Sequence, residues 1–252
     1  MQLNKTLKAA VFSAFLLVLM GSLIGFVQKK QDGRYVANVT IDIDNEYNNF
    51  FIGQNDVQAL LTKDHTAPLA GTKNEEISLK ALELRLKSHK FVKDAQVHRD
   101  LAGNLVVDIK QNRPIARLIL PDEDRYIDRE GTFLPLSDRY TARVLPVFTE
   151  GNTRLSPEFF TSEKGAPYLN VLAYIDSSDF WRAQIAEMHL QADGRVYFVP
   201  QIGTHKIELG KPVNAPQKLG RLMLYYKQVA PNIGWEKYHR INLEFENQIV
   251  CE

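Results

Sequence analysis

The side chains that most often carry chemistry are present in this chain, but their spacing matches no familiar active site. The six histidines include no HExxH motif and no pair at metal-ligand spacing on a clear helix. No GxSxG motif occurs, and no serine has a lysine three residues after it. The single cysteine, Cys251, lies next to the C-terminus, a poor place for a preorganised site, and it has no partner for an internal disulfide. We therefore expect no enzyme activity, no cofactor and no metal.

Two further groups of residues could bind a substrate in principle. A cluster of carboxylates could supply the acid and base of a glycosidase, but it lies among turn residues and we interpret it as a solvated linker. Gly203 and Gly210 lack the spacing of a phosphate-binding loop, and Pro212 stands where Ser or Thr would be needed. The carboxylates of the cluster are Asp122, Glu123, Asp124, Asp128 and Glu130.

The stretch best suited to binding lies near the C-terminus. Within residues 240–251, Ile241, Leu243 and Phe245 alternate with polar residues, which is the period of a half-buried strand. A terminal strand is often a sheet edge, where free N–H and C=O groups can pair with a strand of another chain. An ordinary strand with a solvated outer face explains the same alternation, and spacing alone favours that interpretation.

Residues 9–28 contain no charged side chain. As a helix rising about 1.5 Å per residue they would be roughly 30 Å long, the thickness of a bilayer's hydrocarbon core. A cleaved signal peptide has a shorter apolar core and a small-residue cleavage site, and a buried core helix would have no earlier segment to pack against. We therefore expect a cytoplasmic tail over residues 1–8, a transmembrane helix over residues 9–28 and a linker over residues 29–35. The flanking charges are too balanced to fix the orientation.

The remaining sequence has the composition of a globular α+β protein. The chain has 252 residues and a net charge of +1, with no basic stripe that would indicate nucleic acid. The pattern of residues 36–117 predicts the order strand, helix, helix, strand, strand. The first helix is predicted to begin at a capping box of Asn55 and Gln58, and the second at Ser78 as its N-cap. The last two strands form a hairpin through a turn at residues 100–104.

Residues 118–252 predict a mixed α/β domain with a largely antiparallel sheet. A hairpin turns at residues 128–131, a helix follows Pro167, and a second hairpin turns at Asp193 and Gly194. Another helix is predicted to begin at a capping box of Asn214 and Gln217, and the strand of residues 240–251 closes the domain.

These features resemble a polypeptide-transport-associated (POTRA) domain, and most of all the one in the FtsQ/DivIB family of bacterial cell-division proteins. The matching features are a leucine-bearing helix, Phe91 and Val92 entering a strand, a glycine turn, and a strand that closes on Arg113 and Pro114. The second domain is similar to that family in its Asp-x-x-Gly turn and its leucine-rich helix. The resemblance covers most of residues 36–250.

The resemblance implies a non-catalytic divisome scaffold that binds an FtsB–FtsL-type pair through its last strand and helps regulate septal peptidoglycan synthesis. It implies a single-pass inner-membrane protein at the division septum, with a cytoplasmic N-terminus and a periplasmic bulk. Glu244 stands where the family often has arginine, and Phe245 where it has tyrosine, so an arginine-to-acid bridge to the partner is in doubt. The residues expected to bind the partner are Ile241, Leu243, Glu244, Phe245, Glu246, Asn247, Ile249 and Val250.

Two other functions remain open from the sequence. One is a POTRA-bearing secretion or assembly factor, which should continue into a transmembrane barrel. The other is a membrane-anchored cell-wall enzyme, which should show a cleft with two carboxylates or a histidine-rich metal site.

Overall fold

The computed structural model describes residues 12–22, 25, 35–44, 50–62, 69–152 and 154–252. The chain divides into one compact unit of residues 1–46 and 52–111 and a second of residues 47–51 and 112–252. Within the expected anchor at residues 9–28, the described residues 12–22 and 25 are helical, and the others lie outside the described part. No helix among the described residues combines the length and the apolar character needed to cross a membrane.

The first unit has the predicted element order. Its elements are β1 (Val39–Asp44), α2 (Gln54–Leu61), the 3₁₀ turn η2 (Asn74–Glu76), α3 (Leu79–Lys87), β2 (Val92–Arg99) and β3 (Leu105–Gln111). The sheet order is β1-β3-β2, with β1 parallel and β2 antiparallel to β3. The order strand, helix, helix, strand, strand is thereby confirmed, and so is the hairpin of β2 and β3.

Hydrogen bonds between neighbouring residues fix the first residues of helices α2 and α3 in the first unit. Ser78 caps α3 as predicted, because its hydroxyl accepts from the backbone N–H of Ala81 at 3.3 Å. The capping box predicted at Asn55 is wrong: the cap of α2 is Gly53, whose N–H donates to the carboxylate of Asp56 at 2.8 Å. Asn55 lies inside the helix, because the carboxylate one residue later closes the box instead.

The second unit is built on one large sheet. The strand order is β12-β11-β10-β9-β8-β7-β4-β5-β6. The pairs β4–β7, β7–β8 and β10–β11 are parallel and the other pairs are antiparallel, so the sheet is largely antiparallel as predicted. The strands are β4 (Pro114–Ile119), β5 (Arg125–Asp128), β6 (Phe133–Leu134), β7 (Leu145–Thr149), β8 (Ile185–Leu190), β9 (Val196–Pro200), β10 (Lys206–Gly210), β11 (Arg240–Asn242) and β12 (Val250–Cys251).

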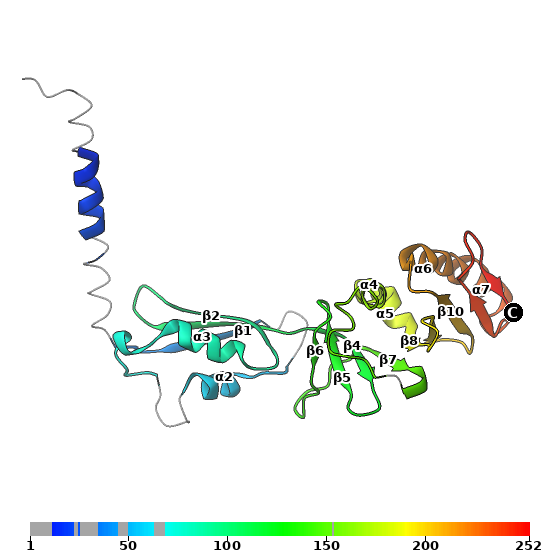
Figure 1. Ribbon diagram of the computed structural model, residues 1–252, viewed down its shortest axis with the longest axis horizontal. Coiled ribbons are helices and arrows are strands. Elements are labelled where there is room, and N and C mark those ends of the chain that lie inside the picture. Colours follow the sequence, from blue (N-terminus) through cyan, green and yellow to red (C-terminus); the bar gives the residue numbers. More distant parts are fainter. Residues whose placement is uncertain (1–11, 23–24, 26–34, 45–49, 63–68, 153) are drawn as a thin grey trace, which may run out of the picture. The chain divides into compact units, whose positions relative to one another are not determined.

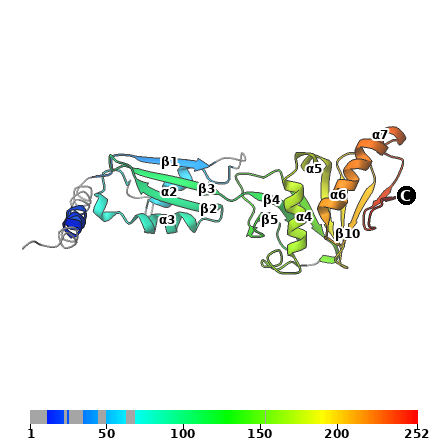
Figure 2. The same ribbon diagram turned by 90° about the horizontal axis from the view of Figure 1, so that it is seen from above.

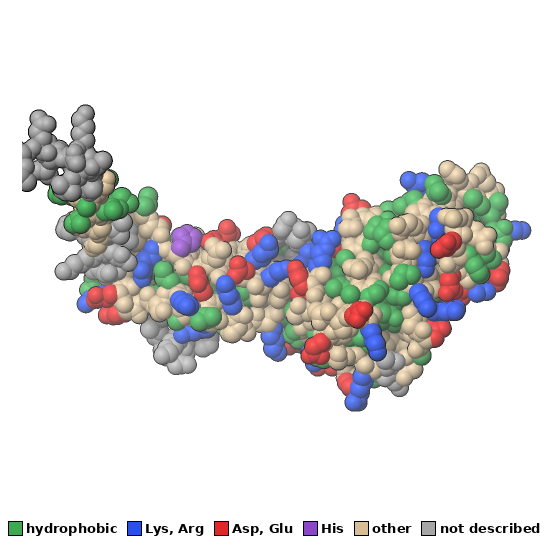
Figure 3. All heavy atoms as spheres, turned by 45° about the horizontal axis from the view of Figure 1, so that its top comes forward, with side chains coloured by type: hydrophobic (Ala, Val, Ile, Leu, Met, Phe, Trp, Pro, Cys, Tyr) green, Lys and Arg blue, Asp and Glu red, His purple; other side chains and the backbone are tan. Residues whose placement is uncertain are grey.

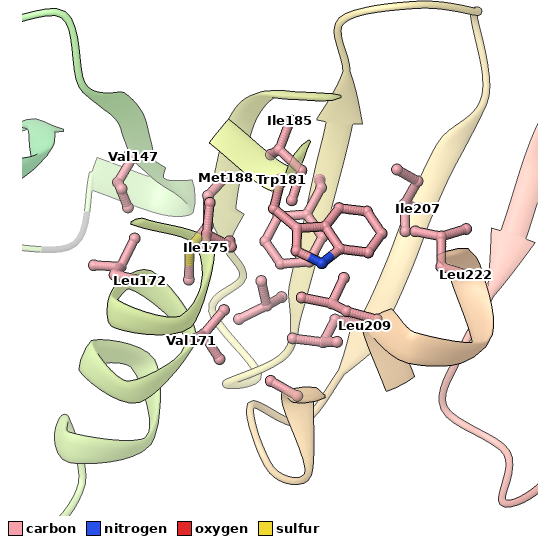
Figure 4. Close-up of a cluster of buried hydrophobic side chains, with 14 of the residues drawn as sticks. Val147, Val171, Leu172, Ile175, Trp181, Ile185, Met188, Ile207, Leu209 and Leu222 are labelled. Carbon is pink, nitrogen blue, oxygen red and sulfur yellow. The ribbon is translucent and has the colours of Figure 1, made fainter. Parts of the chain in front are cut away.

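Helices α4 (Ala166–Asp176) and α6 (Ala215–Leu224) lie against the same face of this sheet (Figures 1 and 2). The core between them is centred on the indole of Trp181, from α5 (Asp179–Gln184), which is 2 % exposed (Figure 4). Leu172 of α4 and Leu222 of α6 lie on opposite sides of this ring. The remaining elements are the 3₁₀ turn η3 (Glu150–Asn152), the π-helical turn η4 (Tyr225–Val229) and α7 (Ala230–Ile233).

The division between the units falls earlier than the predicted domain boundary after residue 117. The first unit ends at Gln111, and Pro114 opens β4, which pairs with β5 and β7 inside the large sheet. Proline is tolerated as the first residue of a strand, where its missing N–H removes no essential ladder bond. Pro114 therefore starts a strand of the second unit instead of ending one of the first.

Substitution of two glycines of the second unit tests how closely the chain packs around them. A Cβ on Gly165 would lie 1.9 Å from the carbonyl oxygen of Phe159, whereas a Cβ on Gly220 meets no atom within 4 Å. We expect Gly165→Ala to lower the free energy of unfolding by about 1–3 kcal/mol or more, through forced backbone movement. Gly220→Ala should raise it by about 0.5–1 kcal/mol, since Gly220 lies inside α6. Urea unfolding followed by tryptophan fluorescence measures both, and equal effects of the two variants would contradict the packing described.

Candidate functional site

The expected single strand at residues 240–251 is two strands that form a short hairpin. Ile241 pairs with Cys251 and Asn242 with Val250, so β12 runs antiparallel to β11. On its other side β11 pairs in parallel with β10. The prediction that residues 240–251 form one edge strand is therefore wrong, because β11 already has a neighbour on each side, β10 and β12. Within the described residues, the edge at this end of the sheet is β12.

The hydrogen-bond register decides which backbone groups of β12 face outward. Arg240 and Glu252 exchange both of their backbone hydrogen bonds, each at 3.0 Å. In an antiparallel ladder such pairs alternate with pairs that form no bond, whose N–H and C=O groups point away from the partner strand. The next pair, Ile241 and Cys251, is of this second kind. The N–H and C=O of Cys251 therefore face away from β11, toward the open side of the sheet.

Hydrogen bonds fix the first residues of the loop between β11 and β12. Leu243 is fully buried, and its N–H donates to the carbonyl of Glu208 at 2.8 Å. The guanidinium of Arg221, from α6, donates to the carbonyl oxygens of Leu243 at 3.1 Å and Phe245 at 3.0 Å. The ring of Phe245 is left 48 % exposed. The loop thus presents an aromatic ring on a backbone that is fixed by charge-assisted hydrogen bonds.

The side chain and the backbone N–H of Glu244 both contact residues of the same chain. Its carboxylate lies 3.5 Å from the guanidinium of Arg195, and its side chain lies over Gly210, where a Cβ would come within 2.9 Å of it. Its backbone N–H donates to the side chain of Asn242 at 2.8 Å. The carboxylate of Glu244 therefore has a partner within this chain.

Helix α6 is fixed to the sheet beside this loop by Lys218. The side chain of Lys218 is buried, and its ammonium donates to the carbonyls of Leu209 at 2.7 Å and Lys211 at 3.0 Å. Burial lowers the pKa of Lys218 from its usual value. These bonds place Arg221, one turn further along α6, where it reaches the loop.

The structure places the predicted partner-binding residues in three environments. Ile241 and Leu243 are buried, and Glu244, Ile249 and Val250 are half-buried. The exposed residues are those of the loop: Phe245, Glu246 and Asn247. Sequence reasoning missed Cys251 as the residue with outward backbone groups, and it missed Arg221 as the support of the loop. The polar run at residues 246–248 was the available signal that the strand is interrupted.

The thiol of Cys251 is half-buried and packs against the core of the second unit. Burial raises the pKa of this thiol above its usual value, so it stays protonated at neutral pH. Its side chain therefore acts as a small apolar group, and only its backbone faces the open edge.

The acidic cluster near residue 124 is occupied by local partners. Arg117 contacts Asp124 at 2.6 Å, Arg125 contacts Glu123 at 2.5 Å, and Arg154 contacts Asp122 at 3.0 Å. The carboxylate of Asp128 accepts from backbone N–H groups of its own turn, those of Glu130 and Thr132. In the described part of the chain, no group of three or more His, Cys, Asp or Glu side chains is placed to hold a metal ion.

The described histidines of the second unit's sheet have protein partners. His189 stacks between the rings of Phe148 and Tyr197, at 4.8 and 4.4 Å between ring centroids, and lies 2.8 Å from the carboxylate of Glu187. His205, just before β10, is 2 % exposed and lies 2.7 Å from the hydroxyl of Tyr226. Burial lowers the pKa of His205 and raises the pKa of Tyr226, so both are neutral at pH 7.

Two family models match the chain; one match lies within the second unit, and the other lies within the first unit apart from residues 47–51. The model described as FtsQ/DivIB, C-terminal related, matches residues 113–252, and the model of a POTRA-like domain matches residues 35–110. No curated protein matches the chain closely enough to count as a relative. The two matches meet where the structure divides, between β3 and β4.

The buried imidazole of His205 should make the second unit sensitive to acid. Because the folded-state pKa of His205 is below its unfolded value of about 6.5, the unfolded chain binds the proton first as the pH falls. We expect the free energy of unfolding to decrease from about pH 7 to pH 5.5, and to decrease less in His205→Gln. Urea unfolding measured by the fluorescence of Trp181 and Trp235 follows this unit alone, because the chain has no other tryptophan. Parallel pH profiles for the two proteins would contradict the prediction.

Proposed function

The chain belongs to the FtsQ/DivIB C-terminal related family, and from this premise we propose that it is a non-catalytic scaffold of the bacterial cell-division machinery. The family match covers the whole sheet of the second unit, and the POTRA-like match covers the first. The family's domains suggest a cell-division scaffold. A scaffold acts through its surface, so the function of this chain has to be sought where that surface can accept another chain.

The proposed partner is an FtsB–FtsL-type pair, bound by strand addition at β12. The observation that carries this proposal is the outward N–H and C=O of Cys251 on an edge strand. A strand laid beside β12 would gain backbone hydrogen bonds there, and side chains on the adjacent loop would select it. Phe245 offers the largest exposed apolar group of that loop. Aromatic side chains are frequent anchors in protein interfaces.

The predicted binding residues divide into two roles in this proposal. Phe245, Glu246, Asn247 and Val250 contact the partner directly. Ile241, Leu243 and Ile249 hold the hairpin against the core, as their burial indicates, and Glu244 acts through its ion pair with Arg195. By holding the partner pair, the chain would help regulate septal peptidoglycan synthesis.

The proposal places the chain in the inner membrane, with residues 9–28 as a single anchor, a cytoplasmic N-terminus and a periplasmic bulk. The support is the uncharged stretch itself, in which Phe12, Phe15 and Leu17 are each more than 60 % exposed. Such a surface is suited to lipid contact. An anchor shared with membrane-bound partners would raise their effective concentration at the edge strand.

A fluorescent fusion of the full chain tests the cellular role. We expect a band at midcell in dividing cells, because the proposal places the protein with the septal machinery. Time-lapse microscopy of cells expressing the fusion at native level measures this. A uniform membrane signal through constriction would contradict the proposal.

Substitution of Cys251 tests the edge directly. Cys251→Pro removes the outward N–H and leaves the bonds to β11 intact, whereas Cys251→Ala keeps the backbone unchanged. We expect Cys251→Pro to weaken binding of the FtsB–FtsL-type pair from the same organism by about tenfold or more, and Cys251→Ala to bind within about twofold of the original chain. Phe245→Ala, which leaves the core untouched, should also weaken binding. Biolayer interferometry with full-length proteins in detergent gives the affinities, and equal binding of the proline and alanine variants would refute strand addition at β12.

A further inference from the structure

The hairpin that carries the proposed binding edge is too short to be ordered by its own ladder. Strand β11 has three residues and β12 has two. A two-stranded hairpin is marginal in water even at greater length. Strand addition requires an edge that is already extended and in register, because ordering it during binding costs free energy. Some other contact must therefore hold β12 in place.

Arg240 makes that contact. Its guanidinium lies 2.8 Å from the carboxylate of Glu208 on β10 and 2.8 Å from the carboxylate of Glu252, the residue after β12. One side chain of the middle strand thus joins the strands on both sides. The backbone of Glu252 reinforces the joint, because its carbonyl accepts from the N–H groups of His239 at 2.7 Å and Arg240 at 3.0 Å.

The Glu208 end of this bridge is itself anchored. The Glu208 side chain is 24 % exposed, and its carboxylate also accepts from the side-chain amide of Asn242 at 3.2 Å and lies 3.8 Å from the ammonium of Lys206. On the face drawn in Figure 3, the C-terminal part of the second unit carries basic and acidic side chains next to one another among hydrophobic ones. The charges around Arg240 therefore form a connected network instead of an isolated pair.

The geometry of this network lets it stabilise the hairpin more than an isolated surface ion pair would. An isolated exposed pair contributes little to stability, because water screens it and two flexible side chains must be ordered. Here one planar guanidinium serves two carboxylates at once, and a lysine could not reproduce that fork. The bridge also spans a hairpin with few other bonds, so its loss should appear as local opening of β12 and not as global unfolding.

We propose that Arg240 is a positioning residue, which bridges Glu208 and Glu252 and so keeps the edge strand β12 extended and in register for partner addition. The inference rests on the proposed function for its consequence in binding. The ordering of β12 by Arg240 follows from contacts within the free chain and does not depend on the proposed function.

The test compares Arg240→Gln with Arg125→Gln in the full-length protein. Arg125 lies on β5, near the other edge of the same sheet, and pairs with Glu123 at similar exposure of the arginine, 36 % against 43 % for Arg240. Hydrogen exchange is measured at the amides of His239, Arg240 and Glu252, which bond across the hairpin, and at β9 as an internal reference. Affinity for the FtsB–FtsL-type pair is measured in the same detergent.

We expect exchange of the three hairpin amides to become about fivefold faster or more in Arg240→Gln, with β9 and the unfolding midpoint unchanged, and affinity to fall by a similar factor. Arg240→Lys should lie between, because an ammonium keeps the charge but loses the fork. Arg125→Gln should match the original chain in all three measurements. Raising the salt from about 50 mM to about 500 mM should bring the original chain toward Arg240→Gln, since screening weakens the bridge.

Hairpin exchange that is the same in Arg240→Gln and the original chain would overturn the proposal, whatever the partner does. Faster exchange with undiminished affinity would overturn it as well, since β12 would then need no ordering before binding. If the original chain does not bind the pair, the proposed function fails, and the exchange measurement still decides whether Arg240 orders β12.

Discussion

A ladder of a few hydrogen bonds decides which backbone groups this protein presents at the end of its large sheet. Because Arg240 and Glu252 form the bonded pair, the residue between Val250 and Glu252 must turn its N–H and C=O outward. A shift of one residue would turn the same groups toward β11 and would also move the Cys251 side chain off the core. The register of this hairpin therefore fixes the chemistry of the edge.

The rest of the second unit serves to hold that register. Trp181 and the helices α4 and α6 bury one face of the sheet, which gives β10 a rigid position. Lys218 ties α6 to the end of β10, and Arg221 on the same helix holds the loop that follows β11. Helix α6 is thus joined to β10 and to the loop by hydrogen bonds to backbone carbonyls. Such bonds do not depend on the side chain of the residue that supplies the carbonyl.

Sequence patterns predicted the elements whose signals are local. The hairpin at Asp193 and Gly194, the helix after Pro167 and the cap at Ser78 all depend on a few neighbouring residues, and the structure has each of them. The terminal hairpin was missed because Leu243 and Phe245 continue the alternation of a strand after the chain has left the sheet. Asn214 adopts a left-handed conformation, with φ of 55°, and makes no capping bond, so its expected capping box with Gln217 is wrong. The outward direction of the Cys251 backbone depends on pairing across the hairpin, which no pattern within residues 240–251 encodes.

The central claim is that another chain adds its backbone to β12. The most direct measurement is amide exchange at Cys251 in the free protein and in the complex with the FtsB–FtsL-type pair. We expect this amide to exchange rapidly in the free protein and to become strongly protected in the complex, while the amides of β6 at the opposite edge keep their rates. Strong binding that leaves the Cys251 amide as exposed as before would contradict the account.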